Sequence, residues 1–331
     1  MAEAEFGTSP RRAFSERLTQ AGFSCLKRLG QNFLYEPEIL EGLVHRAGIS
    51  EGDWVLEIGA GAGTFTAALA KAVGADGLVL SYEIDGRLDS LLREVQEAQP
   101  QVELIMANAL EADFQADIWA AARSRGLAAP TGVLRVAANV PYYVSSKIIR
   151  SCLAQLPEAR SYSFLLDSAM AERLLAQAGK GKAYGPLAVF ITLQGRIEKR
   201  WRLSPKCFYP APQVDSLLFH IESYKPGELE PEREQLRLAL RRNWQAFQLF
   251  VDSLFRQRRK QLEGVLSRMG DSDQEAGPGT RSLSELLAGL GLSGRERAED
   301  LDPWRLASLY LAWTGESGWP DKSGLIEKNK N

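Results

Sequence analysis

The tetrapeptide Asn139-Val140-Pro141-Tyr142 carries the residue types needed to act on an amino nitrogen. An adenine amino group is a poor nucleophile because its lone pair is delocalised into the ring. The side-chain oxygen of Asn139 and the main-chain carbonyl of Val140 can accept its two hydrogens and draw the nitrogen toward a tetrahedral geometry. Pro141 biases Val140 toward an extended backbone, and Tyr142 offers a ring on which an extruded base can stack. The tetrapeptide predicts methyl transfer to an amino nitrogen, driven by positioning and without a strong base.

A glycine-rich turn at Gly59, Gly61 and Gly63 predicts a nucleoside site upstream of this tetrapeptide. It follows an apolar run of strand type, residues 54–56, and precedes a segment of helical spacing, residues 64–70, so a ligand would lie at the strand's carboxyl end. Glycine permits close approach of the ligand and the dihedral angles of a tight turn. Position 64 is threonine, whereas the dinucleotide fingerprint requires glycine there. The pattern therefore favours S-adenosylmethionine over NAD.

Glu83 ends the second predicted strand, residues 79–85, where an open α/β sheet holds the ribose of its nucleotide. We assign Glu83 to the ribose hydroxyls. Asp85 would point to the other face and cap the next helix. The glycines alone are also compatible with a plain strand-to-helix turn, and the tetrapeptide alone with an Asn-x-Pro turn. The ordered combination, with Asn139 directly after a candidate strand at residues 133–138, argues against both.

With these motifs the chain resembles the ribosomal RNA adenine dimethyltransferases, which modify two adjacent adenines near the 3′ end of small-subunit rRNA. The resemblance extends over nearly the whole chain, and an ordered series of segments carries it: residues 28–34, 57–63, 139–146, 171–174, 182–185, 208–216, 255–260 and 297–301.

The resemblance implies roles for individual residues. Asn32 and Leu34, in the same motif as Gln31, would contact the methionine end and ribose of S-adenosylmethionine. Asn139 would serve both cofactor and target base. Phe208 would lie on the opposite face of the flipped adenine from Tyr142.

One cofactor position departs from the family pattern. Asn108 stands where the family usually has an aspartate that accepts from the cofactor's adenine amino group. Its amide oxygen can still accept, but without charge assistance. We expect somewhat weaker cofactor binding.

The charge distribution predicts a local, not a global, nucleic-acid surface. The formal net charge is only −2. Arg256, Arg258, Arg259 and Lys260 place four cations within five residues, with aromatic side chains nearby in sequence. We predict that these four residues contact RNA phosphates; the alternative is an ordinary solvated helix face.

The 331 residues, 45% of them hydrophobic, suffice for two domains. We expect a flexible arm over residues 1–20, a seven-stranded Rossmann-like α/β methyltransferase domain over 21–224, a smaller all-helical domain that contacts RNA or ribosome over 225–320, and a mobile tail over 321–331. Residues 189–193 and 216–221 would form the terminal hairpin of the sheet. Residues 271–282 would form a flexible loop. An aromatic and leucine stripe over residues 304–313 would pack a helix core; an RNA platform is the alternative.

Other functional classes lack support in the sequence. Cys25, Cys152 and Cys207 show no paired spacing, so neither a zinc site nor a disulfide framework is indicated, and we expect no metal. His45 and His220 lie in no recognisable catalytic setting. The N-terminus lacks an apolar signal core, and no stretch approaches a charge-free membrane span. We expect a monomeric cytoplasmic protein that does not bind membranes.

Four functions of different classes fit the sequence. The favoured one is dimethylation of small-subunit rRNA with a role in the biogenesis of immature small subunits. A large-subunit rRNA adenine methyltransferase of the resistance type is the nearest alternative, but the helical C-terminal part favours the small subunit. A non-catalytic ribosome-assembly or transcription factor on the same scaffold is the third. DNA adenine methylation is the fourth, and Val140 breaks the pattern of two prolines usual in such enzymes.

Overall fold

The computed structural model describes residues 9–25, 30–139, 141–272 and 282–315, with only the backbone for residues 142, 199, 200, 271 and 272. The chain forms two compact units. The first contains residues 1–171 and 196–223, and the second contains residues 172–195 and 224–331. The second unit therefore includes a segment that lies before the boundary expected at residue 225. The loop expected at residues 271–282 and the tail at 321–331 fall almost wholly outside the described residues.

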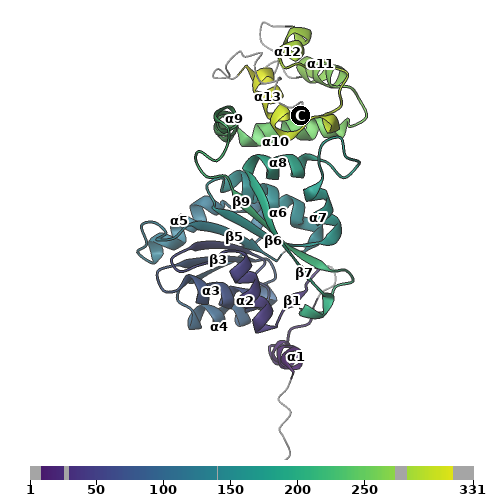
Figure 1. The fold of residues 1–331 in the computed structure, drawn as a ribbon. Coiled ribbons are helices and arrows are strands. Elements are labelled where there is room, and N and C mark those ends of the chain that lie inside the picture. The colour runs from purple at the N-terminus through teal and green to yellow at the C-terminus, as the bar shows by residue number, and fades with distance from the viewer. Residues whose placement is uncertain (1–8, 26–29, 140, 273–281, 316–331) are drawn as a thin grey trace, which may run out of the picture. The chain divides into compact units, whose positions relative to one another are not determined.

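A seven-stranded sheet forms the centre of the first unit, in the order β4-β3-β2-β5-β6-β9-β7 (Figure 1). Strands β2 to β6 pair in parallel and β9 runs antiparallel to β6. The strands are β2 (Trp54–Ile58), β3 (Leu78–Glu83), β4 (Val102–Met106), β5 (Leu134–Ala138), β6 (Ser161–Asp167), β7 (Gly195–Leu203) and β9 (Ser216–Ser223). The predicted Rossmann-like α/β class is confirmed.

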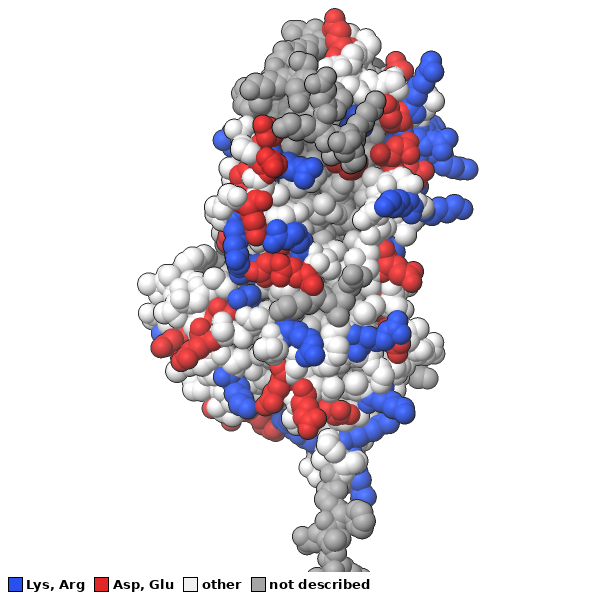
Figure 2. Space-filling view, in the orientation of Figure 1, with Lys and Arg blue, Asp and Glu red and all other residues white. Residues whose placement is uncertain are grey.

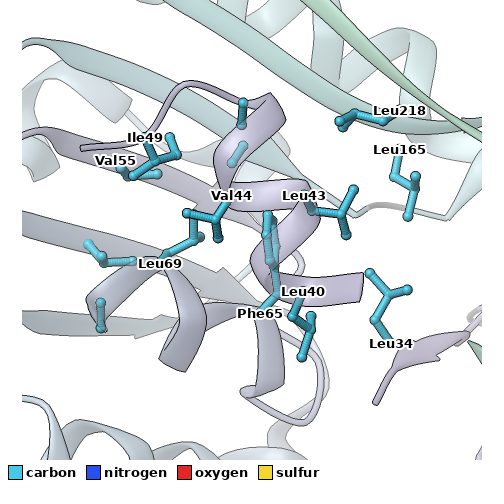
Figure 3. Close-up of a cluster of buried hydrophobic side chains, with 14 of the residues drawn as sticks. Leu34, Leu40, Leu43, Val44, Ile49, Val55, Phe65, Leu69, Leu165 and Leu218 are labelled. Atoms are coloured by element: carbon cyan, nitrogen blue, oxygen red, sulfur yellow. The ribbon is translucent and has the colours of Figure 1, made fainter. Parts of the chain in front are cut away.

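Helices cover both faces of this sheet, because β2 and β3 bury every residue. On one face, Val55, Leu165 and Leu218 pack against α2 (Pro37–Arg46) and α3 (Thr64–Val73), as Figure 3 shows. On the other, the Tyr82 ring meets Phe114 of α5 edge to face. The remaining helices of this unit are α1 (Pro10–Gln20), α4 (Asp89–Ala98), α5 (Phe114–Ser124), α6 (Tyr142–Gln155) and α7 (Ser168–Leu175), the last of which continues into the second unit.

A two-stranded ribbon connects distant parts of the first unit beside the sheet. Strand β1 (Phe33–Leu34) pairs antiparallel with β8 (Phe208–Tyr209), with Leu34 opposite Phe208. Part of the expected N-terminal arm is ordered against it, because Phe14 of α1 packs on the rings of Phe33 and Tyr209. The ribbon therefore holds two segments of the predicted site together, although about 175 residues separate them in the chain.

The described part of the second unit is helical. Its helices are α8 (Pro186–Gln194), α9 (Pro231–Arg242), α10 (Trp244–Arg256), α11 (Leu262–Ser272), α12 (Leu283–Gly289) and α13 (Pro303–Thr314). Helix α13 buries Leu306, Leu309, Tyr310 and Trp313. The stripe over residues 304–313 is therefore a packing face, as predicted.

The strand predicted at residues 189–193 was wrong, because these residues lie in α8. Pro186 occupies the first turn, where its fixed φ favours a helix and its missing N–H costs nothing. The helix is apolar on every side, and Phe190 packs against the rings of Trp244 and Phe247. An apolar run rich in β-branched residues cannot be assigned to strand or buried helix from its period alone. The partner of β9 in the terminal hairpin is β7 instead.

Every helix among the described residues is too short or too polar to cross a bilayer. The same residues contain no group of three metal-ligating side chains close enough to hold an ion. His220 is buried, with its ring nitrogens at Ser163 of β6 and Glu222 of β9, whereas His45 is exposed. Cys25, Cys152 and Cys207 are free.

Candidate functional site

The glycine turn has the conformation that its sequence predicted. Gly59, Gly61 and Gly63 all have positive φ, at +87°, +58° and +79°. A Cβ at Gly61 would meet the Phe33 ring at 2.9 Å, and one at Gly63 would meet Val95 at 2.7 Å. These two glycines are therefore needed for the backbone conformation and for packing against the protein itself, in addition to any approach of a ligand.

Gly63→Ala should destabilise the protein by roughly 1–3 kcal/mol, because alanine is strained at positive φ and its methyl would overlap the Val95 side chain. Urea unfolding measures the difference. Gly86→Ala is the matched control, because Gly86 also follows a strand of the sheet but lacks a positive φ. A Cβ at Gly86 would meet nothing within 4 Å. Equal stabilities for the two variants would contradict this account of the turn.

Glu83 holds the turn in place. One carboxylate oxygen accepts from the Gly61 N–H at 2.8 Å, and the other accepts from the N–H groups of Ile84 and Asp85 at 3.0 and 2.9 Å. The side chain is 8% exposed, and burial raises the pKa of its carboxyl, while the three N–H donors oppose that rise. Glu83 therefore presents a fixed, largely desolvated carboxylate at the end of β3.

Asp85 and Gln31 form a second polar group beside Glu83. Asp85 caps the short 3-10 helix of residues 86–88, as predicted, by accepting from the Arg87 N–H. The amide nitrogen of Gln31 donates to Asp85 at 2.6 Å, and the Arg87 guanidinium forms an ion pair with the same carboxylate. Hydrogen bonding to Arg87 keeps the pKa of Asp85 below its usual value. The structure thus links Gln31 to the end of β3 through a charged acceptor.

One cavity in the first unit brings most of the predicted residues together. It encloses about 1110 Å³ of space, counting its open mouth. The predicted residues that line it are Gln31, Asn32, Leu34, Gly59, Gly61, Glu83, Asn108, Asn139, Pro141 and Phe208. Gly63 lies outside the lining, at the start of α3. Val140 and the Tyr142 side chain lie outside what the structure describes.

Asn139 follows the last residue of β5 and enters the cavity beside the N-terminal motif. Its amide nitrogen donates to the main-chain carbonyl of Asn32 at 3.3 Å, so its amide oxygen is the acceptor atom of the group. The Asn32 amide in turn donates to the carbonyl of Gly30 at 3.0 Å. A Cβ at Gly30 would lie 3.1 Å from Pro141, so the two loops pack closely. The structure thus fixes Asn139 against the segment expected to hold the cofactor.

Phe208 is a wall of the cavity. It is 1% exposed and pairs with Leu34 in the β1–β8 ribbon. This position limits where a base or cofactor can lie and leaves little of the ring accessible at the surface.

Asn108 is engaged locally at both ends of its amide. Its oxygen accepts from the Leu110 N–H at 3.1 Å as the cap of the 3-10 helix of residues 109–111, and its nitrogen donates to Glu111 at 2.8 Å. An amide oxygen has two lone pairs, so one acceptor site toward the cavity is compatible with this geometry.

Sequence reasoning missed two exposed apolar side chains at the cavity. Ile84 is 61% exposed and Tyr143 is 66% exposed, and both line the cavity. Their exposure at the lining makes both side chains available for contact with a ligand in the cavity. In the sequence, only their positions could have indicated a place at the cavity: Ile84 follows Glu83, and Tyr143 follows the tetrapeptide.

Glu57 lies beneath the turn, at the end of β2, and is fully buried. Its carboxylate accepts from the Ser81 hydroxyl at 2.5 Å. Burial raises the pKa of Glu57 from 4.5 to about 7; the Ser81 hydrogen bond opposes this rise, and the charge of Glu83 adds to it. The Glu57 carboxyl therefore titrates near neutral pH.

The raised pKa of Glu57 predicts a pH dependence of stability. The folded state binds the Glu57 proton more tightly than the unfolded state does. Protonated Glu57 therefore adds to the free energy of unfolding at low pH, and this stabilisation is lost as pH rises through about 7. The wild-type protein should lose on the order of 3 kcal/mol of unfolding free energy between pH 5 and 8 through this group, and Glu57→Gln should not show that loss. Urea unfolding at both pH values, with exposed Glu97→Gln as the control, measures the change. Parallel pH profiles for wild type and Glu57→Gln would contradict the assignment.

The four predicted RNA contacts lie in the second unit and differ in their surroundings. Arg256, Arg259 and Lys260 are exposed. Arg258 is half-buried; its guanidinium forms an ion pair with Glu299 and donates to the carbonyl of Lys182 at 2.6 Å. On the face shown in Figure 2, basic and acidic side chains are interspersed, in agreement with the small net charge.

Comparison with known proteins identifies relatives across most of the chain. Residues 22–285 match the model of a family described as ribosomal RNA adenine dimethylase. A protein of Lactobacillus delbrueckii subsp. bulgaricus named ribosomal RNA small subunit methyltransferase A is 32% identical over 283 residues, covering 83% of this chain and 86% of that protein. A protein of Rubrobacter xylanophilus with the same name is 34% identical over 284 residues, covering 86% of this chain and 93% of that protein.

Two solved structures share the fold. A dimethyladenosine transferase from Plasmodium falciparum aligns with a TM-score of 0.63 at 20% identity, covering 86% of this chain and 98% of that one. The 23S rRNA methyltransferase ErmE aligns with a TM-score of 0.53 at 21% identity, covering 85% of this chain and 99% of that one. At these identities the alignments support the architecture alone.

Proposed function

Because the chain belongs to the ribosomal RNA adenine dimethylase family, we propose that it transfers methyl groups from S-adenosylmethionine to the amino nitrogens of two adjacent adenosines near the 3′ end of small-subunit rRNA. One observation carries the proposal for this site: Asn139 and the Glu83-supported glycine turn line the same cavity. An acceptor for the target amino group is thereby combined with a nucleoside site.

The cavity residues suit S-adenosylmethionine. Glu83 would accept from the ribose hydroxyls, and Gln31, Asn32 and Leu34 would hold the ribose and methionine end. The exposed Ile84 side chain and the Asn108 amide would contact the adenine. The cofactor, when bound, supplies an electrophilic methyl group on a sulfonium.

The chain's own residues would activate the target amino group by orientation. The Asn139 amide oxygen and the Val140 carbonyl would accept its two hydrogens, so that the nitrogen lone pair is directed out of the ring plane. Gly30 packs against Pro141 next to the loop that carries the Asn139 acceptor. Tyr142 would stack on one side of the flipped base, and Phe208 would bound its other side as the buried wall of the cavity. Stacking of this kind is worth roughly 1–3 kcal/mol per base.

The named relatives favour the small subunit over the large one. Both are called small-subunit methyltransferases and align over more than four fifths of this chain, whereas the similarity to the large-subunit enzyme ErmE concerns the fold. A non-catalytic assembly factor would not need Asn139, Glu83 and the glycine turn in one cavity. We further propose that the enzyme acts as a monomer on immature small subunits in the cytoplasm; three unpaired cysteines suit a reducing compartment.

Methyl transfer from labelled S-adenosylmethionine to undermethylated small ribosomal subunits tests the proposal. Large subunits and duplex DNA serve as parallel substrates, and nucleoside analysis identifies the product. We expect dimethyladenosine in the small subunit alone. Transfer to large subunits would favour the resistance type, and tight binding of small subunits without transfer would favour an assembly factor.

A further inference from the structure

A lysine-bearing loop between α7 and α8 lies beside the end of α10 within the second unit. We call residues 179–185 the Lys180 loop; it carries Lys180 and Lys182, both exposed. Gly179 and Gly181 have positive φ, at +69° and +103°, and a Cβ at either would meet nothing within 4 Å. These glycines are needed for the turn of the backbone and not for internal packing, so the outer side of the loop is open.

Arg258 fixes this loop to the end of α10. Its guanidinium donates to the carbonyls of Lys182 and Gly181, at 2.6 and 3.4 Å, and forms an ion pair with Glu299. The charge of Arg258 is thus largely neutralised by a neighbouring carboxylate, and its donors are directed at the protein. Arg258 is a positioning residue for the loop.

Further contacts hold the loop on its inner side. The Gly179 N–H donates to the carbonyl of Glu299 at 2.9 Å. The Tyr184 hydroxyl donates to the carbonyl of Leu301 at 2.9 Å, and its ring meets Phe255 of α10 edge to face. The two lysines therefore project from a backbone that is fixed relative to Arg256, Arg259 and Lys260.

Among the described residues, none of these five exposed cations forms an ion pair with a carboxylate. Glu299 is paired with Arg258, and Asp300 accepts from the backbone N–H of Arg297 at 2.8 Å. These five cations are therefore available to an external anion, which the net charge of −2 does not by itself indicate. A polyanion with regularly spaced charges along an extended path complements such a surface.

We propose that the Lys180 loop and the exposed cations at the end of α10 form one surface that binds the phosphodiester backbone of rRNA. The two lysines are the added contacts, and Arg258 acts through them by holding the loop. The identity of the RNA rests on the proposed function; the phosphate chemistry does not.

The test measures the affinity of the full-length protein for undermethylated small ribosomal subunits, without cofactor, over a series of salt concentrations. K180A/K182A should weaken binding about 10–30-fold near physiological salt and reduce the slope of log affinity against log salt by about 1.5, as expected for two lost phosphate contacts. The matched control is K71A/K225A, which removes two exposed lysines outside this surface and should change neither quantity. Unchanged affinity and slope in K180A/K182A would overturn the proposal.

A second variant distinguishes positioning from direct contact by Arg258. R258A alone should lower affinity and slope, and adding it to K180A/K182A should change the slope little further, because its effect passes through the two lysines. A full additional unit of slope in the triple variant would make Arg258 a phosphate contact itself and reject its positioning role.

Methyl transfer by the wild-type protein to the same subunits is measured in parallel. If the wild-type protein transfers methyl groups but K180A/K182A binds the subunits as the wild type does, this surface is rejected and the proposed function stands. If K180A/K182A reduces the salt slope as expected but the wild-type protein transfers no methyl groups, the surface is supported and the proposed function is rejected.

Discussion

Asn139→Ala should lower the rate of methyl transfer by about 10²–10³-fold with the fold intact, because it removes an acceptor that acts on the reacting amino group. The Asn139 side chain is held by its hydrogen bond to the Asn32 carbonyl at 3.3 Å, so it needs little rearrangement to present its amide oxygen to the target amino group. Single-turnover transfer to undermethylated small subunits, with cofactor and subunits saturating, isolates the chemical step from binding.

Two further variants sharpen the Asn139 experiment. Asn139→Asp keeps an acceptor oxygen of the same reach and should retain more of the rate than alanine. Asn243→Ala removes an exposed asparagine at the start of α10, whose side chain makes no capping hydrogen bond, and should leave the single-turnover rate unchanged. An unchanged rate in Asn139→Ala would refute the acceptor role.

Much of the first unit could be predicted from the sequence because short-range physics determines it. The turn at Gly59 to Gly63 requires positive φ at three positions, and the sequence places glycine at each of them. The cap at Asp85 likewise depends on its two nearest neighbours. Where a few adjacent residues decide the conformation, the pattern is sufficient.

The errors and omissions arise where distant contacts decide. Residues 189–193 are apolar enough for a buried strand or a buried helix, and the rings of Trp244 and Phe247, far along the chain, complete a helical environment. The role of Arg258 was hidden for the same reason. Its ion pair with Glu299 and its bond to the Lys182 carbonyl span 41 and 76 positions, so the sequence shows a cation but not its partners.

The site shows both cases together. Glu83 was assigned from its place at a strand end, and the cavity does contain it. The sequence gives no sign that its carboxylate also accepts from the Gly61 N–H, because that contact depends on the pairing of β2 with β3. A residue predicted as a ligand contact is therefore also part of the scaffold of its own site.

Glu83→Ala should consequently affect both cofactor affinity and stability. Three backbone N–H groups lose their acceptor, at a cost of roughly 1–3 kcal/mol for each that stays buried and unpaired. Loss of charge-assisted bonds to the ribose hydroxyls should weaken binding of S-adenosylmethionine by at least about 10²-fold. Calorimetric titration measures the dissociation constant and thermal unfolding the stability, with Glu97→Ala on the exposed face of α4 as the control.

Glu83→Gln separates charge from shape at the same position. The amide nitrogen of glutamine would place a donor opposite backbone N–H groups that now donate to Glu83. This variant should therefore lose affinity for S-adenosylmethionine nearly as much as Glu83→Ala does. Because burial raises the pKa of the Glu83 carboxyl, wild-type affinity should also fall as pH decreases and the carboxylate is protonated, and Glu83→Gln should lack that dependence. A wild-type dissociation constant in Glu83→Gln would show that the carboxylate supports the turn alone and that another group holds the ribose.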